Sequence, residues 1–183
     1  MRGRPLAPEM LDLALALKET DRAGWLRVGI SSPESVAAHS WGMGWLALVL
    51  APPELDLQRI LALCLLHDLP EAVVGDVTPH DGISRQVKAD RERSAAAVML
   101  GARPDLWGLW EDYEKDRSPE AHFVHELDKL DMALQAIRYA RERGADTAEF
   151  LESARATIHS PTLRAVLEEA AGSGTEQAQP GGQ

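Results

Sequence analysis

Residues 60–71 read ILALCLLHDLPE. The apolar run 60–66 is followed at once by His67 and Asp68, and Glu71 comes one helical turn after His67. Residues three and four apart share a helix face, so the stretch can bury its length and present a nitrogen ligand and carboxylates at its end. Histidine and carboxylate side chains are ligands that divalent transition metals accept. The stretch therefore predicts a buried helix that ends in half of a metal site.

Hydrophobic residues recur along the rest of the chain at helical spacing, and β-branched clusters bounded by turns are nearly absent. The first helical segment is so dense in leucine that we expect it to be largely buried. Residues 20–34 contain glycine, serine and proline and should form a loop. The pattern predicts an all-α fold, with helices at 8–19, 36–50, 56–66, 84–100, around 106–113, 120–143, 148–157 and 161–171.

The 183 residues are 45% hydrophobic, which is enough for one domain with a sizeable core. We expect that domain to span residues 1–171. Residues 172–183 are mostly glycine, glutamine, serine and proline with almost nothing to bury, and they predict a disordered tail. The tryptophan-rich segment at 106–113 predicts part of the core or of a subunit interface.

The net charge of −10 argues against a protein that holds a nucleic-acid backbone, because phosphate contacts require clustered Lys and Arg. A small phosphorylated substrate remains compatible, since a bound cation supplies local positive charge. Cys64 is the sole cysteine and is expected to be a buried apolar residue, so a reducing cytoplasm fits best. No apolar run approaches the roughly 20 residues of a membrane span.

The other half of the metal site should consist of His, Asp or Glu side chains on helices, beside buried apolar positions, and two further residues fit this description. His39 lies on an otherwise apolar helix, and Asp128 lies on the edge of a buried stripe in the 120–143 helix. A carboxylate in that position needs a partner. Taken alone, His39 fits a core or supporting histidine with its hydrogen bonds satisfied better than it fits a metal ligand.

Other histidines provide a test of how specific these motifs are. His80 and Asp81 form a second His-Asp pair, but it lies in a Pro- and Gly-containing loop and is expected at the surface or at a pocket rim. His122 and His125 are candidates for a second metal, with an ordinary or supporting helix histidine as the alternative. The combination of motifs, not one dipeptide, carries the prediction.

The order His39, His67-Asp68, Asp128 on separate helices resembles the HD-domain metal-dependent phosphohydrolases. Further blocks resemble the branch of HD domain-containing protein 2 and the bacterial 5'-deoxynucleotidases. They are LKETDRAGW (17–25), PESVAAHSWGM (33–43), LALCLLHDLPEAVVGDVTP (61–79), LWEDYEKDRSPEAHFVHELDKLDMALQA (109–136) and HSPTLRAVLEE (159–169). This resemblance implies a single HD-domain helical bundle with a metal site between helices. It also implies one divalent transition metal such as Mn or Co, hydrolysis of deoxyribonucleoside 5'-monophosphates to deoxynucleoside and phosphate, and a homodimer.

His39, His67, Asp68 and Asp128 would then be the metal ligands. Their two imidazoles and two carboxylates leave positions open on a six-coordinate ion for water and a phosphate oxygen. Glu71 is i+4 from His67, so it can lie over the site and position or deprotonate the attacking water, or manage the leaving group's proton. Its alternative role is a helix-start carboxylate that interacts with the dipole.

The resemblance also implies a substrate end. Asp76 corresponds to a residue used near the sugar, with Thr78 beside it, and Asp76 is a catalytic candidate too. Trp25 corresponds to a ring beside the deoxyribose that excludes a 2'-hydroxyl. In the bacterial pattern an arginine directly precedes that Trp, but here Gly24 does, so Arg22 is the candidate phosphate ligand and Arg27 its substitute.

Three alternative functions stay open on the sequence. The chain could be another HD phosphohydrolase that acts on a nucleoside triphosphate, a cyclic nucleotide or an alarmone. It could be a two-metal HD oxygenase or phosphodiesterase. It could also be a degenerate HD module that binds a nucleotide or a partner without turnover, although retention of all four ligands together with Glu71 argues against that.

Overall fold

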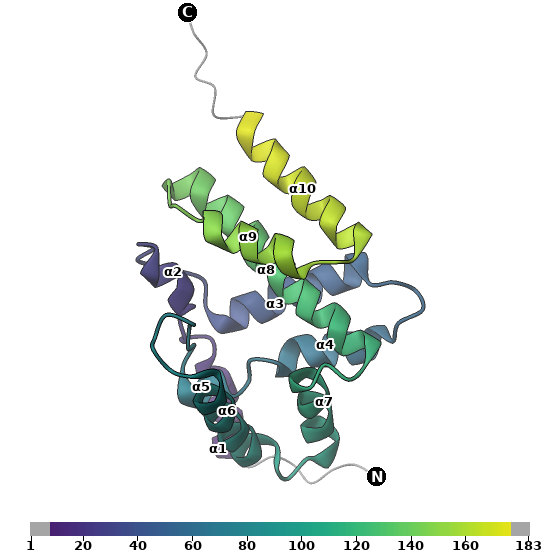
Figure 1. Cartoon of the computed structure of the whole chain (residues 1–183). Coiled ribbons are helices and arrows are strands. Elements are labelled where there is room, and N and C mark those ends of the chain that lie inside the picture. The colour runs from purple at the N-terminus through teal and green to yellow at the C-terminus, as the bar shows by residue number, and fades with distance from the viewer. Residues whose placement is uncertain (1–7, 177–183) are drawn as a thin grey trace, which may run out of the picture.

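The computed structural model describes residues 8–176, and within that range every regular element is a helix (Figure 1). An isolated antiparallel bridge joins Asp21 to Ser35. None of the described helices is long and apolar enough to cross a membrane. The all-α prediction is confirmed, with α1 Pro8–Ala16, α2 Ala23–Arg27, α3 Val36–Leu50, α4 Leu57–Leu66, α5 Glu71–Val74, α6 Arg85–Leu100, α7 Pro104–Glu114, α8 Pro119–Arg143, α9 Ala148–Thr157 and α10 Pro161–Glu176.

Capping side chains fix where several of these helices begin. Ser35 accepts a hydrogen bond from the Ala38 backbone N–H at the start of α3, and Asp56 does the same for Arg59 in α4. Ser84 and Ser118 cap α6 and α8 in the same way. These polar caps satisfy backbone donors that the first helical turn leaves unpaired, which is why the predicted starts agree with the observed ones.

Helix α8 is the centre of the fold and packs against α3, α4, α7, α9 and α10. Figure 1 shows α9 and α10 on one side of α8, with α1, α5 and α6 gathered at the opposite end of the molecule. The buried side chains between α8 and its neighbours form the main core, which includes Met43, Ile60, Leu63, Val124, Leu127, Leu130, Ile158, Leu163 and Leu167.

Four sequence predictions differ from the structure. Leu11 and Leu15 of α1 are 54% and 53% exposed, so that helix is not largely buried. The helix has more apolar side chains than the one face that α5 and the neighbouring core can cover. It also ends at Ala16 and not at the predicted residue 19. The predicted loop 20–34 contains the short helix α2. Helix α10 continues to Glu176, so residues 172–176 belong to it, and the rest of the predicted tail lies outside the described residues.

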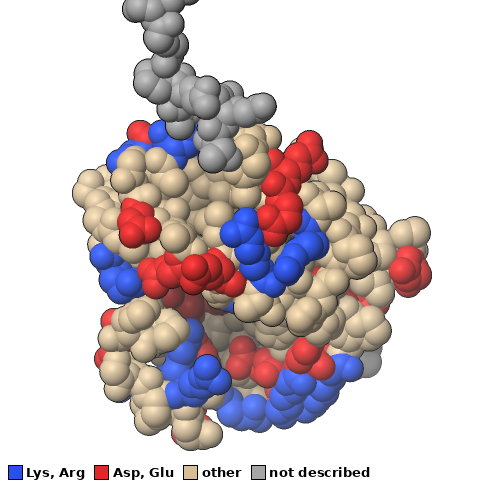
Figure 2. Space-filling model, turned by 45° about the horizontal axis from the view of Figure 1, so that its top comes forward, with Lys and Arg blue, Asp and Glu red and all other residues tan. Residues whose placement is uncertain are grey.

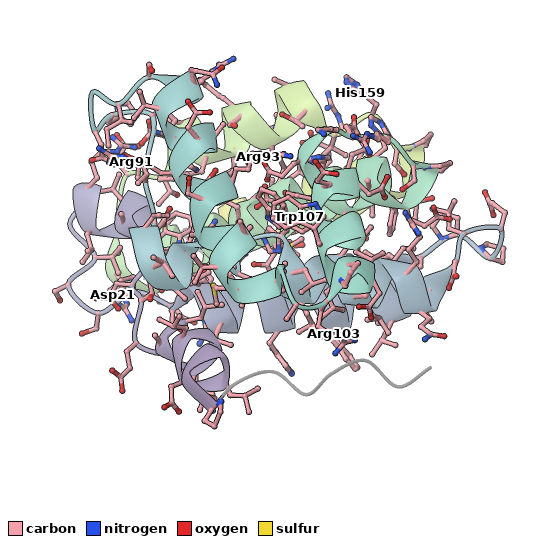
Figure 3. All side chains as sticks on the ribbon, turned by 90° about the horizontal axis from the view of Figure 1, so that it is seen from below. Asp21, Arg91, Arg93, Arg103, Trp107 and His159 are labelled. Atoms are coloured by element: carbon pink, nitrogen blue, oxygen red, sulfur yellow. The ribbon has the colours of Figure 1, made fainter. Side chains whose placement is uncertain are left out.

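The tryptophan-rich helix α7 contributes to the core, as its sequence predicts. Trp110 is 1% exposed and packs with Leu66, Met99 and Leu100 in a cluster between α4, α6 and α7. Trp107 is half-buried, and the Arg93 guanidinium lies over its ring at 5.3 Å from the centroid (Figure 3). This cluster attaches α6 to the rest of the molecule and so places one wall of the site described below.

Candidate metal centre

Three parts of the chain bring the predicted ligands together. His39 comes from α3, Asp128 from α8, and His67 with Asp68 from the turn between α4 and α5. Ligand atoms of His39, His67 and Asp128 all lie within 4.8 Å of one another. Asp68 Oδ2 lies 3.0 Å from His67 Nε2 and 3.9 Å from His39 Nε2. The fold therefore gathers all four predicted side chains around one point.

Unpartnered buried nitrogens indicate what this point is built for. His39 Nε2 and His67 Nε2 are both buried and make no hydrogen bond with suitable geometry, although Asp128 Oδ1 is 3.2 Å from the first. The remaining ring nitrogens have partners: His67 Nδ1 donates to the Cys64 carbonyl at 2.9 Å. Buried polar atoms without partners are costly, and two imidazole nitrogens facing carboxylates form a donor set that fits a divalent metal.

The charges in this cluster shift the pKa values of its members in opposite directions. Burial and the charge of Arg22 lower the pKa of His39, but the neighbouring carboxylates of Asp128 and Asp131 outweigh them and raise that pKa to about 9. Burial raises the pKa of the Asp68 carboxyl, and the neighbouring His67 and Arg22 outweigh this and bring it well below its usual range. Carboxylates at this point are thus ionised, as metal ligation requires.

Glu71 lies beside the ligands without taking part in the cluster. It is the first residue of α5 and is 4% exposed, and its Oε2 atom has no hydrogen-bond partner among the described residues. Burial, with added repulsion from Asp68 and Asp76, raises the pKa of Glu71 to about 10. A carboxyl group held protonated beside ionised carboxylates has the environment of a proton donor or acceptor in catalysis.

A cavity of about 410 Å³ opens on the cluster. Figure 2 shows a hollow on one face of the molecule with acidic side chains inside it. The size suits a small-molecule ligand. Its lining contains His67, Asp68, Asp128 and Glu71 at the centre, together with Arg22, Trp25, Arg27, Asp76, Thr78, His80, Lys88, Glu92, Tyr113, Glu114, Glu149 and Phe150.

Arg22 and Asp76 are fixed where two segments meet. Arg22 directly precedes α2, and its backbone N–H donates to the Glu34 carbonyl at 3.1 Å next to the Asp21–Ser35 bridge. Its Nη1 atom lies 3.4 Å from Asp68 Oδ2. Asp76 Oδ2 accepts a hydrogen bond of 2.8 Å from the Ala23 backbone N–H, so it ties the loop after α5 to the start of α2. Arg27, by contrast, is paired with Glu149 at the rim.

Trp25 lies against the cavity in a rigid aromatic setting. It is 1% exposed, its Nε1 atom donates to Glu34 Oε1 at 3.0 Å, and its ring packs on Tyr139 and Phe150 with centroids 5.3 and 4.4 Å away. Thr78 also lines the cavity, but its hydroxyl donates to Asp81 Oδ2 at 2.9 Å. Trp25 can therefore act as a fixed wall, whereas Thr78 stabilises its own loop.

The remaining histidines lie apart from the cluster. His80 is exposed and contributes to the cavity rim, while its neighbour Asp81 accepts hydrogen bonds from Thr78. His122 is exposed and faces Asp116. His125 stacks on Tyr113 with ring centroids 4.0 Å apart, and its Nε2 bonds the Tyr113 carbonyl. In the part of the chain that the structure describes, neither His122 nor His125 groups with the predicted ligands.

Several lining residues escaped prediction from sequence. Lys88 and Glu92 of α6 are paired at 3.4 Å and reach the cavity, as does Glu114 of α7, whose pKa is raised to about 7 by burial and by Glu92. Phe150 of α9 supplies a further wall. These residues lie on amphipathic helices far from the ligand motifs in sequence, and nothing in their local pattern distinguishes them from ordinary surface positions.

Residues 14–170 match the HD domain family. This chain belongs to the HD-domain family. The HD-domain chain is 36% identical over 166 residues to the "5'-deoxynucleotidase HDDC2" of Danio rerio, an alignment that covers 87% of this chain and 83% of that protein.

Solved structures agree with this placement. A conserved hypothetical protein from Pyrococcus furiosus is 31% identical with a TM-score of 0.76, over 90% of this chain and 99% of the other. A predicted metal-dependent phosphohydrolase from Magnetospirillum magnetotacticum is 26% identical with a TM-score of 0.67, over 92% and 91%. The resemblance expected from the sequence blocks is thereby confirmed, and the His/Asp cluster lies where the motif of an HD-domain protein predicts a metal.

Proposed function

We propose that this HD-domain protein is a metal-dependent 5'-deoxynucleotidase that converts deoxyribonucleoside 5'-monophosphates to deoxynucleoside and phosphate. The observation that carries the proposal is a His-His-Asp cluster, with buried and unpartnered imidazole nitrogens, that opens on a cavity of about 410 Å³. Relatives named 5'-deoxynucleotidase, from Danio rerio and Homo sapiens among others, are similar over most of the chain. A monophosphate suits the cavity because only a few basic side chains line it.

His39, His67, Asp68 and Asp128 are the proposed ligands of one divalent transition metal, such as Mn or Co, as the family resemblance implies. When bound, such an ion activates water, lowering its pKa toward about 7, and neutralises charge on a phosphoryl group. The protein's part is to present two neutral imidazole nitrogens and two ionised carboxylates. The hydrogen bond from His67 Nδ1 to the Cys64 carbonyl leaves Nε2 free for this purpose.

Glu71 is the proposed proton-transfer residue. Its unpartnered Oε2 atom belongs to a buried carboxyl that lines the same cavity as His67 and Asp68. From there its protonated form can orient the attacking water and pass a proton to the departing 5'-oxygen, and its ionised form, which a bound cation would favour, can deprotonate that water. Asp76 supports this role indirectly, because its charge raises the pKa of Glu71, and its own Oδ2 is engaged by the Ala23 backbone.

Arg22 is the proposed phosphate ligand. Its guanidinium lies next to Asp68 and is attracted by the carboxylates of Asp68, Asp128 and Asp76. Arg27, by contrast, is engaged by Glu149 at the rim. A planar guanidinium can bind two phosphate oxygens at once. The pairing with Asp68 keeps Arg22 oriented toward the place where a phosphate would meet the metal ligands.

Trp25 is the proposed selector for deoxyribose, with Asp76 and Thr78 near the sugar. Its indole is held by Glu34 and packs against Phe150, so it cannot easily withdraw from the cavity wall. A rigid ring at that wall leaves no room for an additional 2'-hydroxyl, and an unaccommodated hydroxyl lowers the rate for ribonucleotides.

We further propose that the protein is a homodimer of the cytoplasm that binds neither nucleic acid nor a membrane. Helix α3 exposes apolar side chains at helical spacing: Trp41 is 71%, Trp45 57% and Leu48 56% exposed. Contiguous exposed apolar patches of this kind mark interaction surfaces. The molar mass in solution, measured by light scattering, tests the dimer.

The decisive experiment uses protein stripped of metal and assayed for phosphate release from dAMP, AMP and dATP after addition of Mn²⁺, Co²⁺ or Mg²⁺. Release from dAMP that depends on the added metal and exceeds release from AMP is expected. Failure on every monophosphate with each metal contradicts the proposal, and a preference for dATP would favour a triphosphate hydrolase of the same family.

A further inference from the structure

Asp131 makes a contact with His39 on the side away from the proposed metal. Asp131 lies on α8, three residues after Asp128, and its Oδ2 atom is 2.7 Å from His39 Nδ1. The other ring nitrogen, His39 Nε2, faces Asp128 at 3.2 Å. Two carboxylates of one helix face thus address the two nitrogens of one buried imidazole.

A glycine makes this contact possible. Gly42 lies on α3, one turn after His39, and a Cβ atom built on it would come within 2.2 Å of Asp131 Oδ1. Real Cβ contacts are never that short, so the carboxylate of Asp131 occupies the space that any side chain at position 42 would need. By contrast, a Cβ at Gly44 of the same helix would meet Leu61 Cδ2 at an ordinary 3.9 Å.

We propose that Asp131 is a positioning residue for the metal centre and that Gly42 exists to admit it. Asp131 accepts a hydrogen bond from His39 Nδ1–H, which fixes the tautomer and the ring plane and directs the Nε2 lone pair toward Asp128 and His67. A carboxylate behind a ligating imidazole also raises the basicity of the ligand nitrogen. This role rests on the proposed metal binding at His39 and is independent of which substrate is hydrolysed.

His67 also has a hydrogen-bond acceptor behind its ring, but that acceptor is a backbone carbonyl. Its Nδ1 atom donates to the backbone carbonyl of Cys64 at 2.9 Å, so its tautomer is fixed by main chain that no substitution removes. His39 Nδ1 instead bonds the Asp131 side chain, with no backbone carbonyl partner among residues 8–176, and so depends on Asp131. Glu34 also lies near this pair, but its Oε1 atom accepts from Trp25 Nε1. Asp131 is therefore the hydrogen-bond partner of a ligand histidine that mutation can remove.

The test compares metal affinity across matched variants by titration calorimetry with Mn²⁺ on metal-stripped protein. Asp131→Ala and Gly42→Ala are each expected to weaken Mn²⁺ binding by about 10- to 100-fold, the usual cost of losing such a supporting partner. Asp131→Asn, which keeps an acceptor oxygen without the charge, should lose less. Gly44→Ala makes the same chemical change on the same helix and should bind Mn²⁺ like the wild type.

A double variant separates positioning from folding. Gly42→Ala in the Asp131→Ala background meets no carboxylate, so its melting temperature should recover relative to Gly42→Ala alone while Mn²⁺ affinity stays low. Nitrogen-15 NMR of the zinc-loaded protein gives a spectroscopic readout. In Asp131→Asn the His39 Nδ1–H signal should move upfield relative to the wild type. The His67 Nδ1–H signal should stay in place and serves as the internal control.

Each outcome has a distinct meaning. Wild-type Mn²⁺ affinity in Asp131→Ala, or an unchanged His39 Nδ1–H signal in Asp131→Asn, overturns the positioning role. A wild-type protein that binds no Mn²⁺ overturns the metal centre and this role with it. A wild-type protein that binds Mn²⁺ tightly but hydrolyses no deoxynucleotide contradicts only the proposed function, and the positioning role is then judged on affinity alone.

Discussion

The guanidinium of Arg22 lies 3.4 Å from Asp68 Oδ2, so a residue just before α2 contacts the turn that carries the His-Asp motif. The pair joins two segments that are 46 residues apart in the chain. It places a positive charge among the proposed metal ligands, where a phosphate would have to approach. The contact therefore fixes both a proposed phosphate ligand and a proposed metal ligand in the cavity, and substitutions at these two residues and their neighbours test the proposed function.

Arg22→Gln should raise the KM for dAMP by at least about 10-fold, because a buried charged hydrogen bond to phosphate is worth about 1.5–3 kcal/mol. Arg27→Gln is the matched control, since Arg27 is paired with Glu149 at the rim. Steady-state kinetics measure both, after titration has shown that Arg22→Gln still binds Mn²⁺. A raised KM in Arg27→Gln alone would transfer the phosphate role to Arg27.

Asp68→Ala should abolish metal-dependent phosphate release and weaken Mn²⁺ binding. It removes an ionised carboxylate 3.0 Å from His67 Nε2 and leaves Arg22 without its partner. Calorimetry and a phosphate assay measure the two effects. Asp81→Ala alters the carboxylate of the other His-Asp pair and should leave Mn²⁺ affinity unchanged. Full activity in Asp68→Ala would remove the proposed centre.

Glu71→Gln should lower kcat by about 10²- to 10⁴-fold, the usual contribution of a positioned acid or base. The amide has the same shape and the side chain is not a proposed ligand, so Mn²⁺ affinity should stay within a few-fold of the wild type. Single-turnover phosphate release with bound Mn²⁺ measures the effect. Equal loss of metal binding and of kcat would instead identify Glu71 as a ligand.

Trp25→Phe should reduce the preference for dAMP over AMP by about 10-fold, because a smaller ring admits the 2'-hydroxyl at a lower energetic cost. The ratio of the two kcat/KM values measures this. Tyr139→Phe is a suitable control, since Tyr139 packs on Trp25 and bonds the Glu34 backbone without lining the cavity. An unchanged ratio in Trp25→Phe would place deoxyribose selection elsewhere.

The metal-free protein should lose stability as the pH rises. Folding raises the Glu71 pKa from 4.5 to about 10, by burial and by repulsion from Asp68 and Asp76. The folded state therefore keeps a proton that the unfolded chain releases above pH 4.5, and this contribution is full below 4.5 and is lost toward pH 10. His39, raised from 6.5 to about 9, acts in the same direction.

The melting temperature of chelator-treated protein should thus fall between pH 6 and 9, and Glu71→Gln, whose side chain stays neutral, should show a shallower decline. Differential scanning fluorimetry across buffers measures both slopes. A wild-type melting temperature that rises across this range would show that Glu71 and His39 are not held protonated in the folded metal-free state.

Much of the fold was predictable because the sequence features that start and continue its helices act over short distances along the chain. The caps at Ser35, Asp56, Ser84 and Ser118 act within a few residues of themselves, and they set helix starts that the structure confirms. The extent of α1 and α10 was predicted less well. Leucine density does not say which face finds a partner, and the composition of residues 172–176 did not reveal that α10 continues through them.

The sequence by itself determined the helical class, the order of the proposed ligands and, through several motif blocks, the resemblance to the HD-domain family. These features depend only on residue types and on their spacing along the chain. Only the tertiary structure decided that Asp131 lies behind His39, that Gly42 makes room for it, and that Lys88 and Phe150 line the same cavity as Asp68. Those relations depend on how α3, α6, α8 and α9 pack, and packing arises from contacts between residues far apart in sequence, which no local pattern records.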